Sequence, residues 1–147
     1  MNKTEILNFF DNQHIVILST IRDGVPQTRA LINIRNKNIS PHLVELFKTD
    51  NRMLLMTNTH TDKIAEMHKN PNASLYAFNT DFDGVTLTGT VVELTDDETL
   101  DAIWDESLLH YYPGGRHGGD FSVIEFIPEN FKTYRGSNFK KTSGNVK

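Results

Sequence analysis

The stretch HIVILSTIRDGVPQTRALINIR, residues 14–35, decides the fold, because it holds two strand patterns joined by a tight turn. Residues 14–21 are β-branched and apolar on both faces, which predicts a well-buried strand. Asp23 and Gly24 follow, and an Asp-Gly pair favours the two-residue turn of a hairpin. Residues 27–35 then alternate between two faces, as a second strand would. The chain is therefore predicted to start its sheet with an antiparallel hairpin.

Arg29 lies in the middle of this second strand, among neighbours that are only partly apolar. It shares a face with Gln27 and Leu31, since side chains along a strand alternate with a period of two. An arginine in this place is either a solvated edge residue or a ligand for an anion. The strand pattern by itself leaves both interpretations open.

A second informative stretch is MTNTHTDK, residues 56–63, which links an apolar run to a helical pattern at residues 64–67. It predicts a strand that passes into a helix through hydroxyl and amide side chains, with Lys63 in the first helical turn. Unpaired N–H groups at a helix start attract anions, and hydroxyl groups and a cation strengthen the attraction. The stretch therefore suits a phosphate. The other interpretation is an ordinary helix start, capped by Thr59 or Thr61 without any ligand.

The rest of the chain adds strands and short helices without regular alternation, which favours an antiparallel barrel with added helices over a doubly wound sheet. Capping-box pairs at Asn2 with Glu5 and at Thr95 with Glu98 mark two helix starts. Gly89 within a strand pattern indicates a bend or a close backbone approach. We expect helices at about residues 2–13, 40–47, 61–70 and 95–108, further strands at about residues 53–55, 73–78, 85–94, 121–127 and 131–135, and a loosely ordered polar tail from about residue 137.

The composition excludes several classes of protein. A net charge of −4 argues against a general nucleic-acid binder, and the absence of cysteine rules out disulfides, thiolate metal sites and a cysteine nucleophile. The six histidines have no tight metal-ligand spacing, so we predict no metal site. No apolar run reaches membrane-spanning length, and no signal peptide is evident at the first residues. We expect a single domain over residues 1–147 that is soluble, cytoplasmic and not bound to a membrane.

Taken in order, these pieces resemble the FMN-binding split-barrel family related to pyridoxamine 5′-phosphate oxidase, and most of all its short members of the general-stress-protein type. The likeness extends from about residue 14 to residue 136, and the ordered set of motifs is more specific than any one of them. It is carried by VILSTIRDGVPQTRALINIR (residues 16–35), LLMTNTHTDKIAEMHKNPNASLYAF (54–78), VTLTGTVVELTDD (85–97), Trp104 and YYPGG (111–115).

The resemblance implies an antiparallel split β-barrel of Greek-key type that forms a homodimer with two FMN molecules at the subunit interface. It places the flavin phosphate at Arg29 and Lys63, with Thr61 as a phosphate-binding hydroxyl. Asp62 stands where full-length oxidases have a second cation, and that ligand is not carried over. Further contacts with the cofactor are expected from the backbone of Ala30, Leu31 and Ile32, from Met56 and Thr57, and, across the interface, from Tyr112 and Tyr134.

Three functions remain open after this comparison. The first is an FMN-dependent oxidoreductase of an unidentified small molecule, in which the flavin carries the chemistry and no catalytic side chain can be named. The second is a flavin-binding sensor or stress-response protein without turnover. The third, true pyridoxamine 5′-phosphate oxidation, ranks lowest, because the ending YRGSNFKKTSGNVK lacks the arginine- and proline-rich segment of the full oxidases. Relatives on the same barrel bind deazaflavin or haem, so the choice of FMN is itself a prediction.

Overall fold

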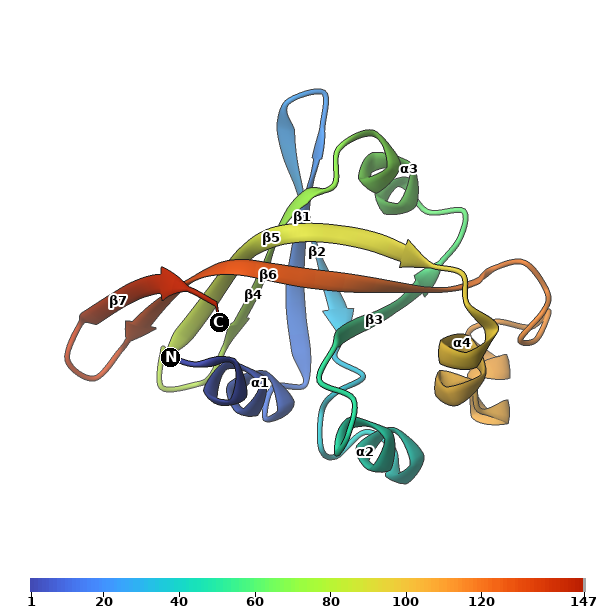
Figure 1. Ribbon diagram of the computed structural model, residues 1–147, viewed down its shortest axis with the longest axis horizontal. Helices are drawn as coiled ribbons and strands as arrows, with labels where there is room; N and C mark the ends of the chain where they lie inside the picture. Colours follow the sequence, from blue (N-terminus) through green and yellow to red (C-terminus); the bar gives the residue numbers. More distant parts are fainter. Residues whose placement is uncertain (147) are drawn as a thin grey trace.

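The computed structural model describes residues 1–146, which form one antiparallel sheet of seven strands with four α-helices around it (Figure 1). No helix among these residues is both long enough and apolar enough to cross a membrane. The elements are α1 (Lys3–Asp11), β1 (Ile15–Arg22), β2 (Val25–Ile32), α2 (Pro41–Phe47), β3 (Met53–Asn58), α3 (Asp62–Lys69), β4 (Asn72–Phe78), β5 (Gly84–Leu94), α4 (Asp97–Ile103), the 3₁₀-helix η1 (Glu106–His110), β6 (Phe121–Arg135) and β7 (Lys140–Asn145).

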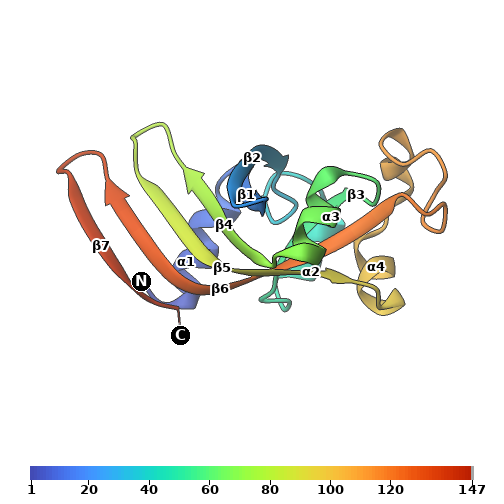
Figure 2. The ribbon, with the colours of Figure 1, turned by 90° about the horizontal axis from the view of Figure 1, so that it is seen from above.

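The strand order is β2-β1-β4-β5-β6-β3, and β7 pairs with the C-terminal half of β6, beyond the part that pairs with β3. Within residues 1–146, β2 and β3 lie at the two ends of this strand order and each pairs with one strand only, so the sheet does not close. β7 pairs with β6 alone and is a further edge strand. Figure 2 shows β4, β5, β6 and β7 side by side toward one end of the molecule, with α2, α3 and α4 toward the other.

The opening hairpin has the predicted form. Asp23 and Gly24 have φ angles of 51° and 76°, as a two-residue hairpin turn requires, and β1 and β2 pair along their full length. The bounds of the second strand differ from the predicted residues 27–35. The strand begins at Val25 and ends at Ile32. It ends there because the Asn33 side chain turns back to donate to the backbone oxygens of Phe10 and Gln13.

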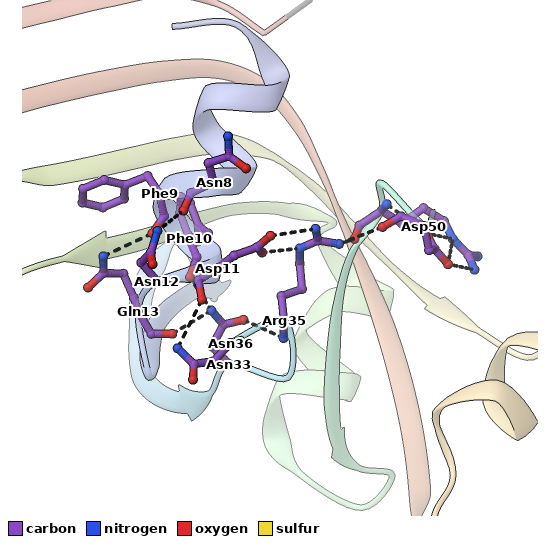
Figure 3. A network of polar contacts seen from close by, with 11 residues as sticks. Asn8, Phe9, Phe10, Asp11, Asn12, Gln13, Asn33, Arg35, Asn36 and Asp50 are labelled. Atoms are coloured by element: carbon purple, nitrogen blue, oxygen red, sulfur yellow. Dashed lines mark hydrogen bonds and ion pairs between the residues drawn. The ribbon is translucent and has the colours of Figure 1, made fainter. Parts of the chain in front are cut away.

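Arg35 links the end of β2 to the start of β3, the two edge strands at the ends of the strand order. Its guanidinium donates to the carboxylate of Asp11 at the end of α1 and to the backbone oxygens of Asp50 and Arg52 just before β3 (Figure 3). The two edge strands are therefore held together here by a side chain and not by a ladder of backbone hydrogen bonds. In Figure 1 the end of β2 lies near the start of β3, and the strands diverge from there.

Two apolar clusters lie on opposite sides of β3, which explains why this strand is apolar on both faces. The first contains Met53 and Leu55 and is filled by α1, whose predicted Asn2–Glu5 capping box is present. The second contains Leu54 and is covered by α2 and α4. Its core residues are Ile34, Leu43, Phe47, Leu54, Leu100, Ile103, Tyr112, Phe121 and Val123.

Three local predictions can be compared directly with the structure. Gly89 lies opposite a bulge in β6, and a Cβ added to it would be 2.0 Å from the Ile127 oxygen, so the predicted close approach is confirmed. The cap predicted at Thr95 is wrong, because Asp96 accepts from the Thr99 N–H instead. Part of the expected loose tail forms β7, which is held by backbone pairing with β6, by a hydroxyl pair and by Val146 packing on the first cluster.

Candidate functional site

A cluster of charged side chains lies where α3 packs against the β1–β2 hairpin. Arg29 from β2 donates from Nη1 to Thr20 Oγ1 (2.6 Å) and from Nη2 to Glu66 Oε2 (2.9 Å). The Thr20 hydroxyl in turn donates to the same Glu66 oxygen. Thr20 is fully buried, and Glu66 is exposed by only 5%. The carboxylate on α3 is therefore buried with two donors, one of them a cation.

The charge of the Glu66 carboxyl depends on its two hydrogen-bond donors, Thr20 and Arg29. Burial acts to raise its pKa, but the hydrogen bonds from Thr20 and Arg29 and the guanidinium charge outweigh burial and hold the pKa below its usual range. Glu66 therefore carries a negative charge in the neutral pH range and compensates the positive charge of Arg29.

Lys63 is the second cation of the cluster, one helical turn before Glu66. Burial, with the nearby Arg29 charge adding to it, lowers the pKa of this ammonium below its ordinary value. Within residues 1–146, Lys63 Nζ donates no hydrogen bond and has no carboxylate within 4 Å. An ammonium that is partly desolvated beside another cation is electrostatically unfavourable, and an anion in contact with both would relieve this.

The polar residues between β3 and α3 are mostly bonded within the protein. Asn58 donates to Asp120, and Thr59 pairs with the Ser122 hydroxyl at 2.6 Å. Thr61 occupies the N-cap position of α3, but its hydroxyl donates to the Asn58 oxygen and does not cap the helix. The first turn of α3 thus has no side-chain cap, and neither Thr59 nor Thr61 caps it as the sequence suggested.

Thr57 is the exception in this stretch. Its side chain is buried, and its Oγ1 is the one buried side-chain polar atom in the described part of the chain that has no hydrogen-bond partner. Buried hydroxyls are nearly always bonded, so an orphaned one indicates a group that is completed by something outside the chain. Thr57 belongs to β3, the strand that leads directly to Lys63.

The other predicted contacts come from the two free sheet edges. Ala30, Leu31 and Ile32 lie at the end of β2, whose outer edge forms no ladder with another described strand. Met56 lies on β3, the opposite edge, next to Thr57. An edge strand presents unpaired N–H and C=O groups, which a planar heterocycle can use. Arg29 and Lys63 are thus close enough for their charges to interact, and β2 and β3 are both edge strands. Contact of a flavin with Ala30, Leu31, Ile32 and Met56 stays a prediction.

Asp62 does not oppose the cluster directly. Its carboxylate is 85% exposed and lies 3.9 Å from Arg22 Nη1 at the end of β1. An exposed pair of this kind contributes little energy. The replacement of a cation by Asp62 therefore removes a positive charge without placing a buried negative charge beside Lys63.

Tyr112 and Tyr134 lie far apart along the sheet. Tyr112 is buried in the second cluster, edge to face with Trp104 and Phe121, and burial, aided by the charge of Asp120, raises its pKa to about 12. Tyr134 is half-buried near the end of β6 and lines a cavity of about 420 Å³. Contact of either tyrosine with the flavin of a second subunit stays a prediction.

Sequence reasoning missed Thr20 and Glu66. Thr20 lies in a strand that is apolar on both faces, where a hydroxyl needs a partner, and Glu66 follows Lys63 by one helical turn on the inward side of α3. Those two signals together could have indicated a buried polar cluster. In the described chain no group of three or more His, Asp or Glu side chains is arranged to hold a metal ion.

The fold and the cluster together define a class, an open antiparallel barrel with two neighbouring cations where the helix α3 packs against the first hairpin. The chain belongs to the pyridoxamine 5′-phosphate oxidase family, whose sequence model matches residues 3–135. No curated protein matches the chain.

Solved structures of low sequence identity share the fold. A protein from Clostridium acetobutylicum related to general stress protein 26 of B. subtilis is 23% identical, with a TM-score of 0.75 over 98% of this chain and 94% of that one. An FMN-binding relative from Nostoc punctiforme is 15% identical, with a TM-score of 0.64 over 98% and 94%. A haem-binding protein from Mycobacterium smegmatis is 16% identical, with a TM-score of 0.65 over 97% and 57%. The expected split-barrel fold is confirmed.

Proposed function

We propose that this protein binds FMN, with the phosphate at Arg29 and Lys63, and that it is an oxidoreductase of a small molecule. The observation that carries the proposal is the Lys63 ammonium, which has no partner in the described chain and lies beside Arg29 at the uncapped start of α3. Arginine offers planar, paired donors and lysine a compact charge, a combination that suits a phosphate monoester. Thr57 supplies an unused hydroxyl nearby in the sequence.

Further support comes from the sheet edges. β2 and β3 are edge strands, whose free backbone groups and apolar side chains a flat ring can use. When bound, the flavin would supply the hydride chemistry. The protein's own residues would anchor the phosphate at Arg29 and Lys63 and hold the ring at the edge of β2. Membership of the family and the FMN-binding relative favour this ligand.

A homodimer is part of the proposal, because one face of the sheet is apolar and exposed in the single chain. Ile15 and Ile32 are cross-strand partners that are 47% and 44% exposed, and Phe78, stacked on Tyr76, is 50% exposed. Tyr76 is paired with Ile17, so these side chains share one face. Contiguous apolar surface of this kind marks an interface. A second copy on this face would lie beside the edge of β2.

The first test is the cofactor and its site. Purified protein is expected to be yellow, to release FMN and not FAD on denaturation, and to have the mass of a dimer by light scattering. Replacing Arg29 and Lys63 together by alanine should weaken FMN binding about 100-fold or more, since each removes a charge-assisted hydrogen bond. His60→Ala, an exposed change in the same loop, should leave binding nearly unchanged.

Several results would contradict this proposal. A colourless protein that takes up no FMN, or equal effects of the double variant and His60→Ala, would reject the flavin and phosphate assignments. A haem absorption spectrum would indicate the ligand of the Mycobacterium smegmatis neighbour instead. Bound flavin that neither NADH nor NADPH reduces would favour the second candidate, a flavin-binding protein without turnover.

A further inference from the structure

Glu66 is the residue of the cluster that the phosphate assignment does not explain. A site for a dianion gains from positive charge, yet here a buried carboxylate lies 2.9 Å from the Arg29 Nη2 that the ligand would use. Glu66 is exposed by only 5%, so solvent screens this pair poorly. Arg29, Lys63 and Glu66 together carry one net positive charge, where the two cations alone would carry two.

We propose that Glu66 is an internal competitor for the charge of Arg29. Its carboxylate stays paired with this guanidinium in the empty and in the occupied site, and it limits how tightly a phosphate monoester binds. The inference rests on the proposed function and specifies how that site is regulated. A phosphate that approaches Arg29 and Lys63 meets the Glu66 carboxylate at close range. It must share the guanidinium with Glu66, and the repulsion between the two anions lowers the affinity.

The geometry shows how the guanidinium is divided. Arg29 Nη1 and Nη2 each donate one hydrogen bond, to Thr20 Oγ1 and to Glu66 Oε2, and these two acceptors are themselves bonded to each other. The remaining N–H donors of Arg29 have no partner in the part of the chain that is described. A phosphate can therefore bind Arg29 from the other side while Glu66 stays in place.

Thr20 allows Glu66 to remain buried as the ligand binds. A buried carboxylate that loses its only partner costs several kcal/mol. Here the fully buried Thr20 hydroxyl would still donate to Glu66 if the ligand drew Arg29 away. Glu66 would thus keep a hydrogen-bond donor and remain inside the site in both states.

The test uses Glu66→Gln, which keeps the size and an acceptor oxygen but removes the charge. Binding of FMN and of riboflavin, which lacks the phosphate, is measured by fluorescence titration. Glu66→Gln should bind FMN about tenfold more tightly, ~1.4 kcal/mol, and should leave riboflavin unchanged. Glu45→Gln, an exposed carboxylate on α2, serves as the control for net charge. Glu66→Met, which removes the charge at similar volume, should act in the same direction and covers the case in which Glu66→Gln does not fold.

A second measurement works without flavin. Thermal unfolding is followed in inorganic phosphate and in sodium chloride of equal ionic strength. Phosphate should raise the Tm of Glu66→Gln more than that of the wild type, because the stabilisation by a ligand is RT ln(1 + [ligand]/Kd) and therefore grows as Kd falls. The same contrast in a protein that binds no FMN would leave this inference standing and reject the proposed function.

Two outcomes would overturn the inference. If Glu66→Gln binds FMN more weakly than the wild type, Glu66 positions Arg29 for the ligand and does not compete with it. If FMN binds normally and the variant changes neither the FMN affinity nor the response to phosphate, Glu66 has only a structural role. In both cases the FMN proposal would survive.

Discussion

Arg29 and Arg35 come from one short segment of the chain, and each is paired with a buried or partly buried carboxylate. Arg35 is 4% exposed and donates twice to Asp11 and once to each of two backbone oxygens (Figure 3). Its guanidinium also lies 4.5 Å from the centre of the Phe47 ring. Four of the N–H donors of Arg35, its charge and a face of its planar guanidinium are therefore in use.

Arg29 is 23% exposed and has only two of its donors in use. A second cation, Lys63, lies close enough for the charge of Arg29 to lower its pKa, and it has no partner of its own in the described residues. This difference separates a structural arginine from a binding one. Burial and a carboxylate partner are common to both, whereas Arg29 has most of its N–H donors unused and lies beside Lys63, a cation without a partner.

The largest expected effect is the loss of the Arg35 network. Arg35→Met should lower the free energy of unfolding by about 3–5 kcal/mol, because it leaves the Asp11 carboxylate and two backbone oxygens without their donor. Arg29→Met should cost about 1–3 kcal/mol, since Thr20 still donates to Glu66. Arg22→Met, at an exposed pair, should cost about 0.5 kcal/mol or less. Urea unfolding of the three variants gives the order.

An equal loss for Arg29→Met and Arg35→Met would break the comparison. It would mean that Arg29 is as much a part of the folded structure as Arg35. In that case the weaker FMN binding of Arg29 variants would no longer identify a phosphate ligand.

The two arginines also differ from the local features of the fold in how much of their surroundings the sequence predicts. The Asp23-Gly24 turn, the close backbone approach at Gly89 and the irregular alternation of strands and helices follow from local signals, and the structure has all three. Arg29 and Lys63 could be paired only through the family resemblance, since they lie on separate elements. The partners of Arg29, which are Thr20 and Glu66, and the Asp11 partner of Arg35 come from distant segments of the chain, and no periodicity in the sequence reveals these contacts.

The sequence did not predict the edge strand β7, and the reason is different. Its sequence KKTSGN is polar and almost wholly exposed, so it lacks the alternation that marks a strand. It exists because β6 continues past the region that pairs with β3 and offers a free edge there. A strand of this kind is specified by its neighbour and not by its own residues.

A smaller effect on the free energy of unfolding is expected at two buried threonines, one with hydrogen-bond partners in the fold and one without. Thr20 is bonded to both Arg29 and Glu66, whereas the buried Thr57 hydroxyl has no partner in the described chain. Thr20→Val should lower the free energy of unfolding by about 1–2 kcal/mol, and Thr57→Val should raise it by up to about 1 kcal/mol in ligand-free protein. With FMN, Thr57→Val should weaken binding. Equal destabilisation by both changes would place Thr57 with the structural groups.

The smallest effect concerns Lys63 and its dependence on pH. Burial, with the charge of Arg29, lowers the folded-state pKa of Lys63 below 10.5, the value expected in the unfolded chain. Between these two pKa values the unfolded chain binds more protons, so this residue makes the free energy of unfolding rise with pH. Below the folded-state pKa the charged Lys63 is therefore a constant, small destabilisation, and above 10.5 it contributes none.

Lys63→Met should accordingly raise the free energy of unfolding of ligand-free protein at pH 7 by about 0.5 kcal/mol or less, while it weakens FMN binding. The gain should shrink as the pH approaches 10.5. Lys69→Met, at an exposed position on the same helix, should show no such pH dependence. Stability curves in urea between pH 7 and 10 measure both. A loss of stability at pH 7 in Lys63→Met would show that this ammonium has a partner in the fold, and the cluster would then resemble the closed network of Arg35.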